Sequence, residues 1–239
     1  MIKFDIVTLF PTLFTEHFNN LPFKKAISKQ LAEYNLWDLK KYSVNNYGSV
    51  DDKTYGGGVG MVIMIEPVFK ALSDIYSEKI MEDRIKGGSD FFTNNKQKIV
   101  VLSPRGERFT QKKAEELSKS AQITLICGRY EGLDARIEDN IATDVISLGD
   151  FVLSGGEIPA LAIMESVTRL LPGILEKEEA LKVESFSPEN ETGQGFIEYP
   201  QYTRPENFKG LEVPKILLSG NHKEIEKWRK EKSKISGKN

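Results

Sequence analysis

The second half of the chain repeats one pattern three times: a short apolar run, a loop containing glycine, and a stretch with the apolar spacing of a helix. The apolar runs cover residues 98–102, 123–127 and 145–148. The helical stretches cover residues 110–120, with Thr110 as the expected cap, then 133–141, then the stretch that closes at Leu171-Pro172-Gly173. Three consecutive β-loop-α units predict an α/β fold with a parallel sheet that helices cover on both faces.

The first half of the chain has a less regular pattern. Residues 2–10 predict a first strand and residues 36–39 a shorter second one. Helices are predicted over residues 11–18, 24–34 and 66–80, and an exposed polar connection over residues 87–97.

The loops of the three repeated units are expected to meet at one edge of the sheet. They are residues 103–106 (SPRG), 128–132 (GRYEG) and 147–157 (SLGDFVLSGGE). Ligands of parallel sheets bind beyond the carboxyl ends of the strands, and glycines let main-chain groups line a pocket there. In the third loop, Ser154 and Glu157 have the spacing of a capping box at a helix start. The alternative is a tight strand-to-helix turn without a ligand.

A second glycine-rich stretch, residues 50–61 (VDDKTYGGGVGM), lies before the repeated units. No Gly-Lys-Ser/Thr follows it, and Met61 breaks the G-x-G-x-x-G pattern, so it is neither of the common phosphate-binding loops. From the residues alone, a flexible surface loop is an equal alternative to a binding loop.

Composition excludes several kinds of chemistry. With 39% hydrophobic and 28% charged residues, the chain has the composition of an ordinary globular protein. One cysteine, Cys127, permits no internal disulfide, and two distant histidines, His17 and His222, cannot form a usual zinc site, so no metal site is predicted. Neither an apolar run of about 20 residues nor a signal-peptide pattern is present, and we expect a cytoplasmic protein without membrane contact.

Charge is unevenly distributed along the chain. The net charge is −2, but residues 200–239 contain ten Lys and Arg against five Glu. A basic end on an acidic body favours a polyanion partner, with a solvated Lys-rich tail as the alternative. Residues 184–198 are polar and contain glycine, which predicts a linker able to order on binding, and residues 222–230 predict an amphipathic helix.

Seven motifs, taken in order, carry a resemblance to a known family. They are TLFP, VDDKTYGGGVGM, LSPRG, CGRYEGLDARI, SLGDFVLSGGEIPA, PQYTRP and LLSGNHKEIEKWR. Over residues 1–230 the chain resembles the bacterial tRNA (guanine-37, N1)-methyltransferases, the TrmD family of the SPOUT class. Two other classes remain to be separated by experiment: a cofactor-binding regulatory module without catalysis, and a structural RNA-binding protein.

The resemblance implies a fold and partners that the pattern does not reach. The implied fold is an α/β parallel sheet with a deep trefoil knot plus a small helical C-terminal domain. The implied division is a cofactor-binding methyltransferase domain over residues 1–171, a flexible linker over 172–198 and a small basic tRNA-binding domain over 199–239. The implied cofactor is S-adenosylmethionine, with a need for Mg²⁺ left open. The implied partners are a second copy of the chain and a tRNA with guanine at positions 36 and 37.

The resemblance also assigns residues to the site. Cofactor contacts fall on the three loops, at Leu102, Ser103, Pro104, Gly106, Gly128, Tyr130, Glu131, Gly132, Ser147, Leu148, Gly149, Leu153, Gly155, Gly156 and Pro159. Contacts with the target guanine fall on Tyr55, Gly56, Gly57, Gly58, Gly60 and Met61.

The implied catalytic pair is Glu184 as general base and Arg169 as the cation that stabilises charge on the guanine O6. The family has aspartate where this chain has Glu184, and proline where it has Val59. Glu198, beyond a longer linker, is the competing base, and a purely structural role is the alternative for Glu184.

Overall fold

The computed structural model describes residues 1–45, 48–177, 181, 184–187 and 196–235. Residues 178–180, 182–183 and 188–195 of the predicted linker, and residues 236–239 of the predicted tRNA-binding domain, therefore lie outside the described residues. The chain divides into two compact units, Met1–Leu175 and Glu176–Asn239. The first unit runs slightly beyond the predicted boundary at residue 171.

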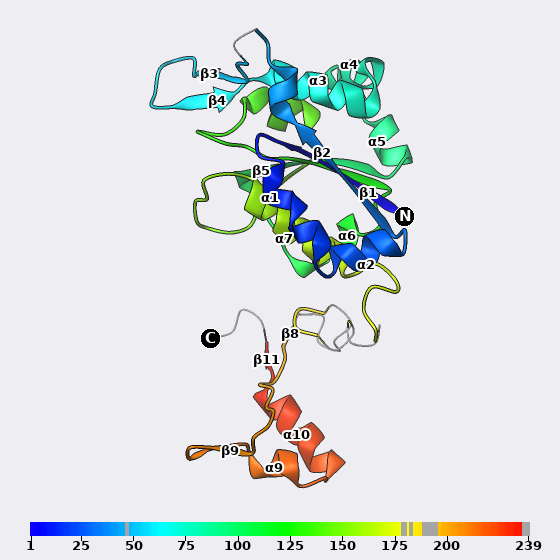
Figure 1. Cartoon of the computed structure of the whole chain (residues 1–239), viewed down its shortest axis with the longest axis vertical. Helices are drawn as coiled ribbons and strands as arrows, with labels where there is room; N and C mark the ends of the chain where they lie inside the picture. The colour runs from blue at the N-terminus through cyan, green and yellow to red at the C-terminus, as the bar shows by residue number, and fades with distance from the viewer. Residues whose placement is uncertain (46–47, 178–180, 182–183, 188–195, 236–239) are drawn as a thin grey trace. The chain divides into compact units, whose positions relative to one another are not determined.

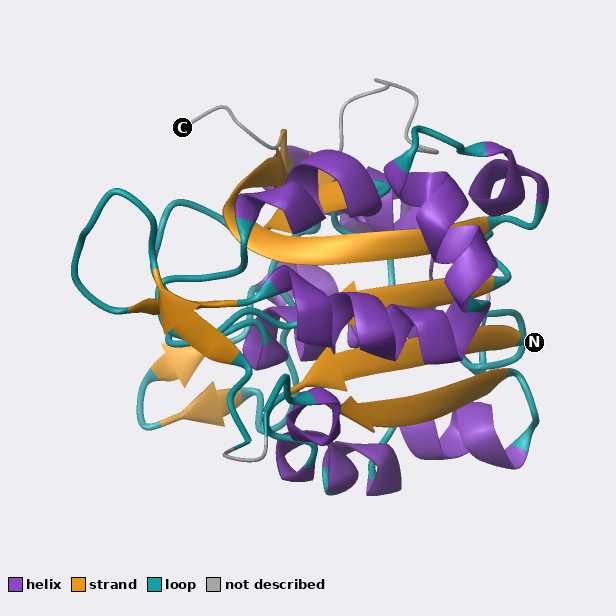
Figure 2. Ribbon diagram, turned by 90° about the horizontal axis from the view of Figure 1, so that it is seen from above, coloured by secondary structure: helices purple, strands orange, loops and turns teal. Residues whose placement is uncertain are grey.

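A five-stranded parallel sheet forms the centre of the first unit (Figure 2). The strands are β1 (Ile2–Thr8), β2 (Ala32–Asp38), β5 (Gln97–Arg108), β6 (Gln122–Ile126) and β7 (Asp144–Ser147), in the order β2-β1-β6-β5-β7. All four neighbouring pairs are parallel. The predicted α/β fold with a parallel sheet is confirmed.

Helices cover both faces of this sheet (Figure 1). One face carries α1 (Thr12–Thr15), α2 (Phe23–Ser28), α6 (Gln111–Leu117) and α7 (Glu157–Thr168), with the short η1 (His17–Asn19). The other carries α3 (Ile65–Tyr76), α4 (Glu78–Ile85), α5 (Asp90–Asn94) and the turns η2 (Leu39–Tyr42) and η3 (Ile137–Ile141). Successive strand residues point to opposite faces, so Val100 belongs to the first core while Ile99 and Val101 belong to the second.

Three predicted helices differ from the observed elements. The helix over residues 24–34 forms only in its first part: α2 ends at Ser28, and β2 begins at Ala32, where tertiary pairing with Ile2 of β1 overrides the local preference. The helix over 66–80 is split at Ser77, whose φ of 89° breaks the helical path. Of the helix over 133–141, only the π-helical turn η3 forms.

Two further segments carry more structure than the pattern predicted. The connection over residues 87–97 contains α5, whose Phe92 is buried in the second core. The SPRG loop lies within β5, where pairing with β7 shifts register between Leu102 and Glu107. Gly106 permits this because a Cβ there would lie 2.5 Å from the main chain of Val145 and Ile146.

The glycine-rich stretch is an exposed hairpin arm. Its strands are β3 (Asp51–Lys53) and β4 (Met61–Ile63), which pair antiparallel. Tyr55 is fully exposed and Val59 is 92% exposed. Met64 donates its main-chain N–H to Val50, which closes the base of the arm.

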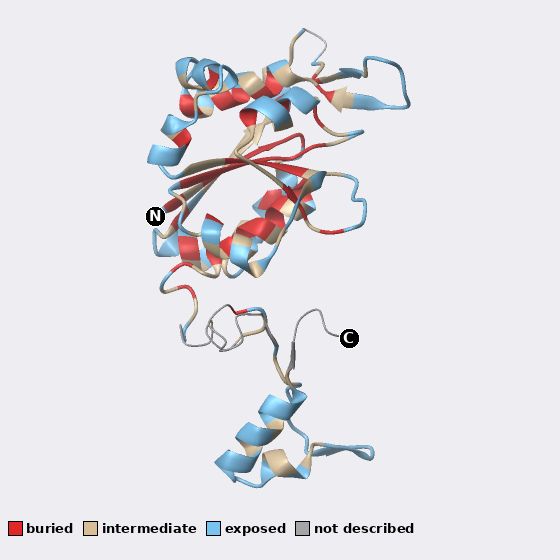
Figure 3. Cartoon of the chain, turned by 180° about the vertical axis from the view of Figure 1, so that it is seen from behind, coloured by how far each residue is buried: buried red, intermediate tan, exposed pale blue. Residues whose placement is uncertain are grey.

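The second unit is small and has little interior (Figure 3). It contains β8 (Phe196–Ile197) paired with β11 (Lys234–Ile235), β9 (Asn207–Phe208) paired with β10 (Leu211–Glu212), α9 (Lys215–Leu218) and α10 (His222–Lys232). The predicted amphipathic helix is confirmed, and Asn221 caps it by accepting from the Glu224 N–H. Trp228 packs against the rings of Tyr199 and Tyr202. Among the described residues of this unit, no hydrophobic side chain is buried.

A search of the described residues finds no helix of the length and apolarity that crossing a membrane requires.

Candidate active site

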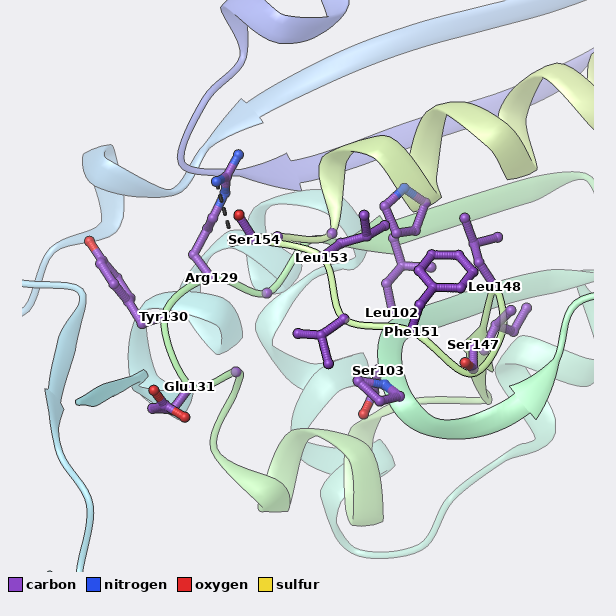
Figure 4. A pocket seen from close by; sticks show the side chains of 18 of the residues that line it. Leu102, Ser103, Arg129, Tyr130, Glu131, Ser147, Leu148, Phe151, Leu153 and Ser154 are labelled. Carbon is purple, nitrogen blue, oxygen red and sulfur yellow. Dashed lines mark hydrogen bonds between the residues drawn. The ribbon is translucent and has the colours of Figure 1, made fainter. Parts of the chain in front are cut away.

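The three predicted loops enclose one pocket, which lies beyond the carboxyl ends of β6 and β7 and beside the middle of β5 (Figure 4). Its volume is about 290 Å³. The wall contains every residue of the predicted cofactor set except Gly106, namely Leu102, Ser103, Pro104, Gly128, Tyr130, Glu131, Gly132, Ser147, Leu148, Gly149, Leu153, Gly155, Gly156 and Pro159. It also contains Arg129, Ile146, Phe151, Val152 and Ser154, which were not among the predicted cofactor contacts. Gly106 packs instead against the β7 main chain.

The two adjacent glycines before α7 bring two loops into main-chain contact. Gly156 donates its N–H to the carbonyl of Gly128 at 2.9 Å, and Gly155 forms an isolated bridge with Arg129. A Cβ on Gly156 would lie 2.7 Å from the Cα of Cys127. Glycine is therefore required at 156 by the close approach of the chain to the end of β6.

The predicted capping box at residues 154 and 157 is wrong. Gly156 occupies the N-cap of α7, and no side chain caps the helix. Glu157 is fully buried; its Oε1 accepts from Thr8 Oγ1 at 2.8 Å, and its Oε2 accepts from Arg129 Nε at 2.8 Å. A buried carboxylate is tolerated because both oxygens are hydrogen-bonded and one is paired with a guanidinium.

The Glu157 network fixes the shape of the pocket. It joins the end of β1, the loop after β6 and the start of α7. Arg129 also donates to the carbonyl of Ser154 at 3.3 Å, and its guanidinium lies 4.6 Å from the centroid of the Phe10 ring. The Arg129 guanidinium is therefore paired within the protein. Glu131 is the carboxylate residue on the pocket wall.

The pocket wall offers groups suited to binding a ligand. Its wall combines the apolar side chains of Leu102, Leu148 and Phe151 with main-chain groups of the glycine loops. Cys127 lies behind the wall, and burial raises the pKa of its thiol well above the usual value, so the thiol stays protonated. Such a site suits a ligand with an aromatic ring and polar edges, held by main-chain hydrogen bonds.

A larger cavity of about 1080 Å³ adjoins the pocket on the side of the hairpin arm. The two share the wall residues Leu102, Ser103, Pro104, Glu131 and Gly132. Of the predicted guanine-binding residues, only Tyr55 lines this cavity.

Two other residues of the guanine-binding set contact the shared wall. Glu131 donates its N–H to the Met61 carbonyl, and a Cβ on Gly60 would lie 2.6 Å from Glu131 Cγ. Gly56, Gly57 and Gly58 have no contact of this kind: a Cβ on Gly58 would approach only Thr54, and the other two face open space.

Of the two predicted catalytic residues, Arg169 does not lie on the pocket wall, and Glu184 belongs to the other unit. Arg169 is the C-cap of α7, whereas the pocket lies at the start of that helix. A helix rises about 1.5 Å per residue, so about 18 Å of α7 separates them. Glu184 belongs to the second unit, where the neighbouring Ser185 Oγ accepts the N–H of Glu198 at 3.0 Å. The two candidate bases therefore lie on adjacent stretches of chain.

A parallel sheet with a glycine-lined pocket at its carboxyl edge defines the chain as an α/β ligand-binding protein, with a fold that many enzymes have. Comparison with known proteins makes this specific. The family described as "tRNA (Guanine-1)-methyltransferase TrmD" matches residues 2–239. The chain is 44% identical over 232 residues to a tRNA (guanine-N(1)-)-methyltransferase of Bacillus pumilus (strain SAFR-032), covering 97% of this chain and 87% of the relative. It is 43% identical, with the same coverage, to proteins of that name from Bacillus cereus (strain AH820) and Bacillus anthracis (strain A0248). The chain belongs to the TrmD family, as the seven motifs predicted.

Proposed function

We propose that this tRNA (guanine-N1)-methyltransferase moves a methyl group from S-adenosylmethionine to N1 of guanine 37, next to a guanine at position 36. The observation that carries the proposal is the convergence of three loops, distant in sequence, on one pocket built almost entirely from the predicted cofactor residues. Membership of the family supports the type of reaction, and the pocket is the site at which we propose that it occurs.

The pocket fits the methyl donor. Leu102, Leu148 and Phe151 give apolar surface for an adenine ring, and main-chain groups of the glycine loops give hydrogen bonds to its edges. The Glu131 carboxylate is the charge on the wall that favours a cationic ligand. When bound, the cofactor supplies an electrophilic methyl group on a sulfonium.

The protein's own part is to remove a proton and stabilise a charge. Guanine N1 carries a proton at neutral pH, so N1 becomes nucleophilic only as that proton leaves. Glu184 takes the proton, and Arg169 stabilises the negative charge that develops on O6. Alignment of the two substrates supplies much of the remaining rate.

The position of Arg169 supports a homodimer with a shared site. About 18 Å of α7 separates this residue from the pocket of its own chain, too far for both to act on one base. A second copy brings its own Arg169 to that pocket. The apolar residues Leu161, Met164 and Val167 of α7 cannot form the dimer surface, because they are buried within the chain's own core. Exposed apolar side chains near the start of α7 fit the role better: Phe10, Leu13 and Ile158 are 39%, 43% and 57% exposed.

The path of the chain after β7 supports the trefoil knot. From β7, at the edge of the sheet, the chain returns past β5 to the loop that follows β6, where Gly156 bonds Gly128. It then continues as α7 across the face that also carries α1, α2 and α6. A crossing of this kind at the cofactor loops is what the knot of the SPOUT class requires.

Gly156→Val is expected to weaken binding of S-adenosylmethionine about tenfold or more, equivalent to about 1.4 kcal/mol. The reason is that a side chain at this position pushes the 155–157 turn away from Cys127 and opens the pocket wall. Isothermal titration calorimetry on the folded variant measures its affinity for S-adenosylmethionine. Gly128→Ala is the control for folding, since its Cβ would meet nothing nearer than 3.6 Å. Unchanged cofactor affinity in folded Gly156→Val removes this pocket from consideration.

Residues 199–239 are proposed to bind the phosphates of the tRNA backbone. This proposal is supported by the charge of residues 200–239, which contain ten Lys and Arg and five Glu. Several of these basic residues lie on the exposed face of α10. Binding should weaken steeply with salt: a grip on about four phosphates lowers affinity by more than 100-fold between 50 and 200 mM salt. Filter binding across that range measures the slope, and an affinity that does not change with salt contradicts the phosphate grip.

The experiment that tests the function incubates the protein and S-adenosylmethionine with tRNA transcripts that carry guanine or adenine at position 37. Mass spectrometry of nuclease fragments locates the methyl group. We expect one methyl per guanine-37 transcript, on N1, and none on the adenine-37 control. Binding without transfer would favour a regulatory module or a structural RNA-binding protein. Parallel reactions with Mg²⁺ and with a chelator test the metal, for which the described residues offer no cluster of three or more His, Cys, Asp or Glu.

A further inference from the structure

Residues 168–175, here called the exit segment, carry Arg169 and lead out of the first unit. Short-range turns continue the chain after α7: Leu170, Leu171 and Ile174 each donate to a carbonyl three residues earlier. Leu171 and Ile174 are 8% and 4% exposed and belong to the first core. Gly173 adopts a φ of 83°, which turns the chain between them.

Three side chains from elsewhere in the unit hold this segment on both sides of Arg169. Before it, the Tyr34 hydroxyl is 2.7 Å from Thr168 Oγ1. After it, Lys29 Nζ donates to the Gly173 carbonyl at 3.0 Å, and Lys25 Nζ donates to the Ile174 carbonyl. Lysine–carbonyl bonds are charge-assisted, and a short chain segment tied at both ends has little freedom to move.

The holding groups are themselves firmly placed. Lys25 lies in α2, and Lys29, four residues later, is the C-cap of that helix, so the two lysines leave it on the same side. Phe23 and Ala26 fix α2 to the sheet because both are buried in the first core.

Tyr34 of β2 is fixed in the same way. It stacks on Phe4 and Phe18 at ring distances of 5.2 and 5.1 Å. Burial raises the pKa of Tyr34 to about 12, so its hydroxyl keeps its proton at neutral pH.

We propose that Lys25, Lys29 and Tyr34 are positioning residues for methyl transfer: they fix the exit segment, and with it Arg169 and the direction in which the chain leaves toward Glu184. This inference rests on the proposed role of Arg169. None of the three lines the cofactor pocket or the cavity beside it. Their effect is therefore on the rate of the chemical step, which is sensitive to shifts of about 1 Å in a catalytic group, and not on cofactor binding.

The test compares matched variants. Tyr34→Phe and the double variant Lys25→Met, Lys29→Met remove the bonds while keeping most of each side chain. Tyr76→Phe removes another buried hydroxyl bond, to Thr124 at 2.6 Å, in the second core. Lys24→Met removes an exposed lysine of the same helix, for which no side-chain bond is found among the described residues.

Single-turnover methylation of a guanine-37 transcript, at saturating cofactor and tRNA, is the measurement. We expect the double lysine variant to be slowed about tenfold or more and Tyr34→Phe severalfold, with cofactor Kd unchanged. Lys25→Arg should keep the wild-type rate, because arginine also donates to a carbonyl. Tyr76→Phe and Lys24→Met should match the wild type. Hydrogen exchange of the amides of residues 170–175 should quicken only in the first two variants.

Two results overturn the inference. One is a wild-type rate in the double lysine variant; the other is an equal loss of rate in Tyr34→Phe and Tyr76→Phe, which would mark a general effect of stability. Failure of the proposed function looks different, since the wild-type protein itself would then transfer no methyl group to guanine 37.

Discussion

Glu184→Gln is expected to slow single-turnover methylation by about 100-fold or more, the usual contribution of a positioned general base. The amide is close to isosteric but cannot accept the N1 proton. Glu184→Asp should keep part of the rate, because aspartate has nearly the same proton affinity and loses only reach. The shorter side chain is the one that the resembling family has at this position.

Glu198→Gln is the matched control. The Glu198 N–H donates to Ser185 Oγ, so Glu184 and Glu198 lie on adjacent stretches of the second unit. The same substitution can therefore be compared at two neighbouring carboxylates. If Glu184→Gln retains a near-normal rate while Glu198→Gln loses it, Glu198 is the base and the assignment fails.

Arg169→Met is expected to lower the methylation rate by about 100- to 1000-fold, the range found when one group that stabilises a developing oxyanion is removed. Methionine keeps a long unbranched side chain at the end of α7 but carries no charge. Cofactor affinity should not change, because the pocket lies at the other end of that helix. Calorimetry with S-adenosylmethionine and single-turnover kinetics separate the two quantities.

Arg169→Lys separates the contribution of the positive charge from that of the guanidinium geometry. A lysine retains the charge but not the planar fork of the guanidinium, so we expect an intermediate rate. A rate equal to that of the wild type in Arg169→Met would assign the cation to another residue.

The sheet and the pocket could be predicted because their signals are local. Each strand after residue 97 is a short apolar run followed by glycine, and parallel strands bring their carboxyl ends together whatever the details of packing. The residues that the family resemblance assigned to the cofactor lie on these loops, and nearly all of them line one pocket. Gly106 lies off the pocket wall because SPRG looks like a loop but continues β5 beside β7.

Contacts between distant residues could not be predicted. Ser154 and Glu157 match a capping box in sequence, yet Glu157 bonds Thr8, 149 residues away, and Arg129. The helix expected over residues 24–34 fails for a similar reason, because Ala32 begins a strand that pairs with Ile2. In both cases a partner far along the chain decides the structure, and a single sequence does not name that partner.

The most direct test of the shared active site mixes two variants within one dimer. Gly128→Val adds a bulky side chain at a residue of the pocket wall, and Arg169→Met removes the cation; each alone is expected to give an inactive homodimer. Differently tagged chains, coexpressed and purified through both tags, yield the mixed dimer. If the pocket of one chain works with Arg169 of the other, one of the two sites is intact, and methylation should recover to about half of the wild-type rate. If the mixed dimer is as inactive as its parents, Arg169 acts within its own chain and the shared site is contradicted.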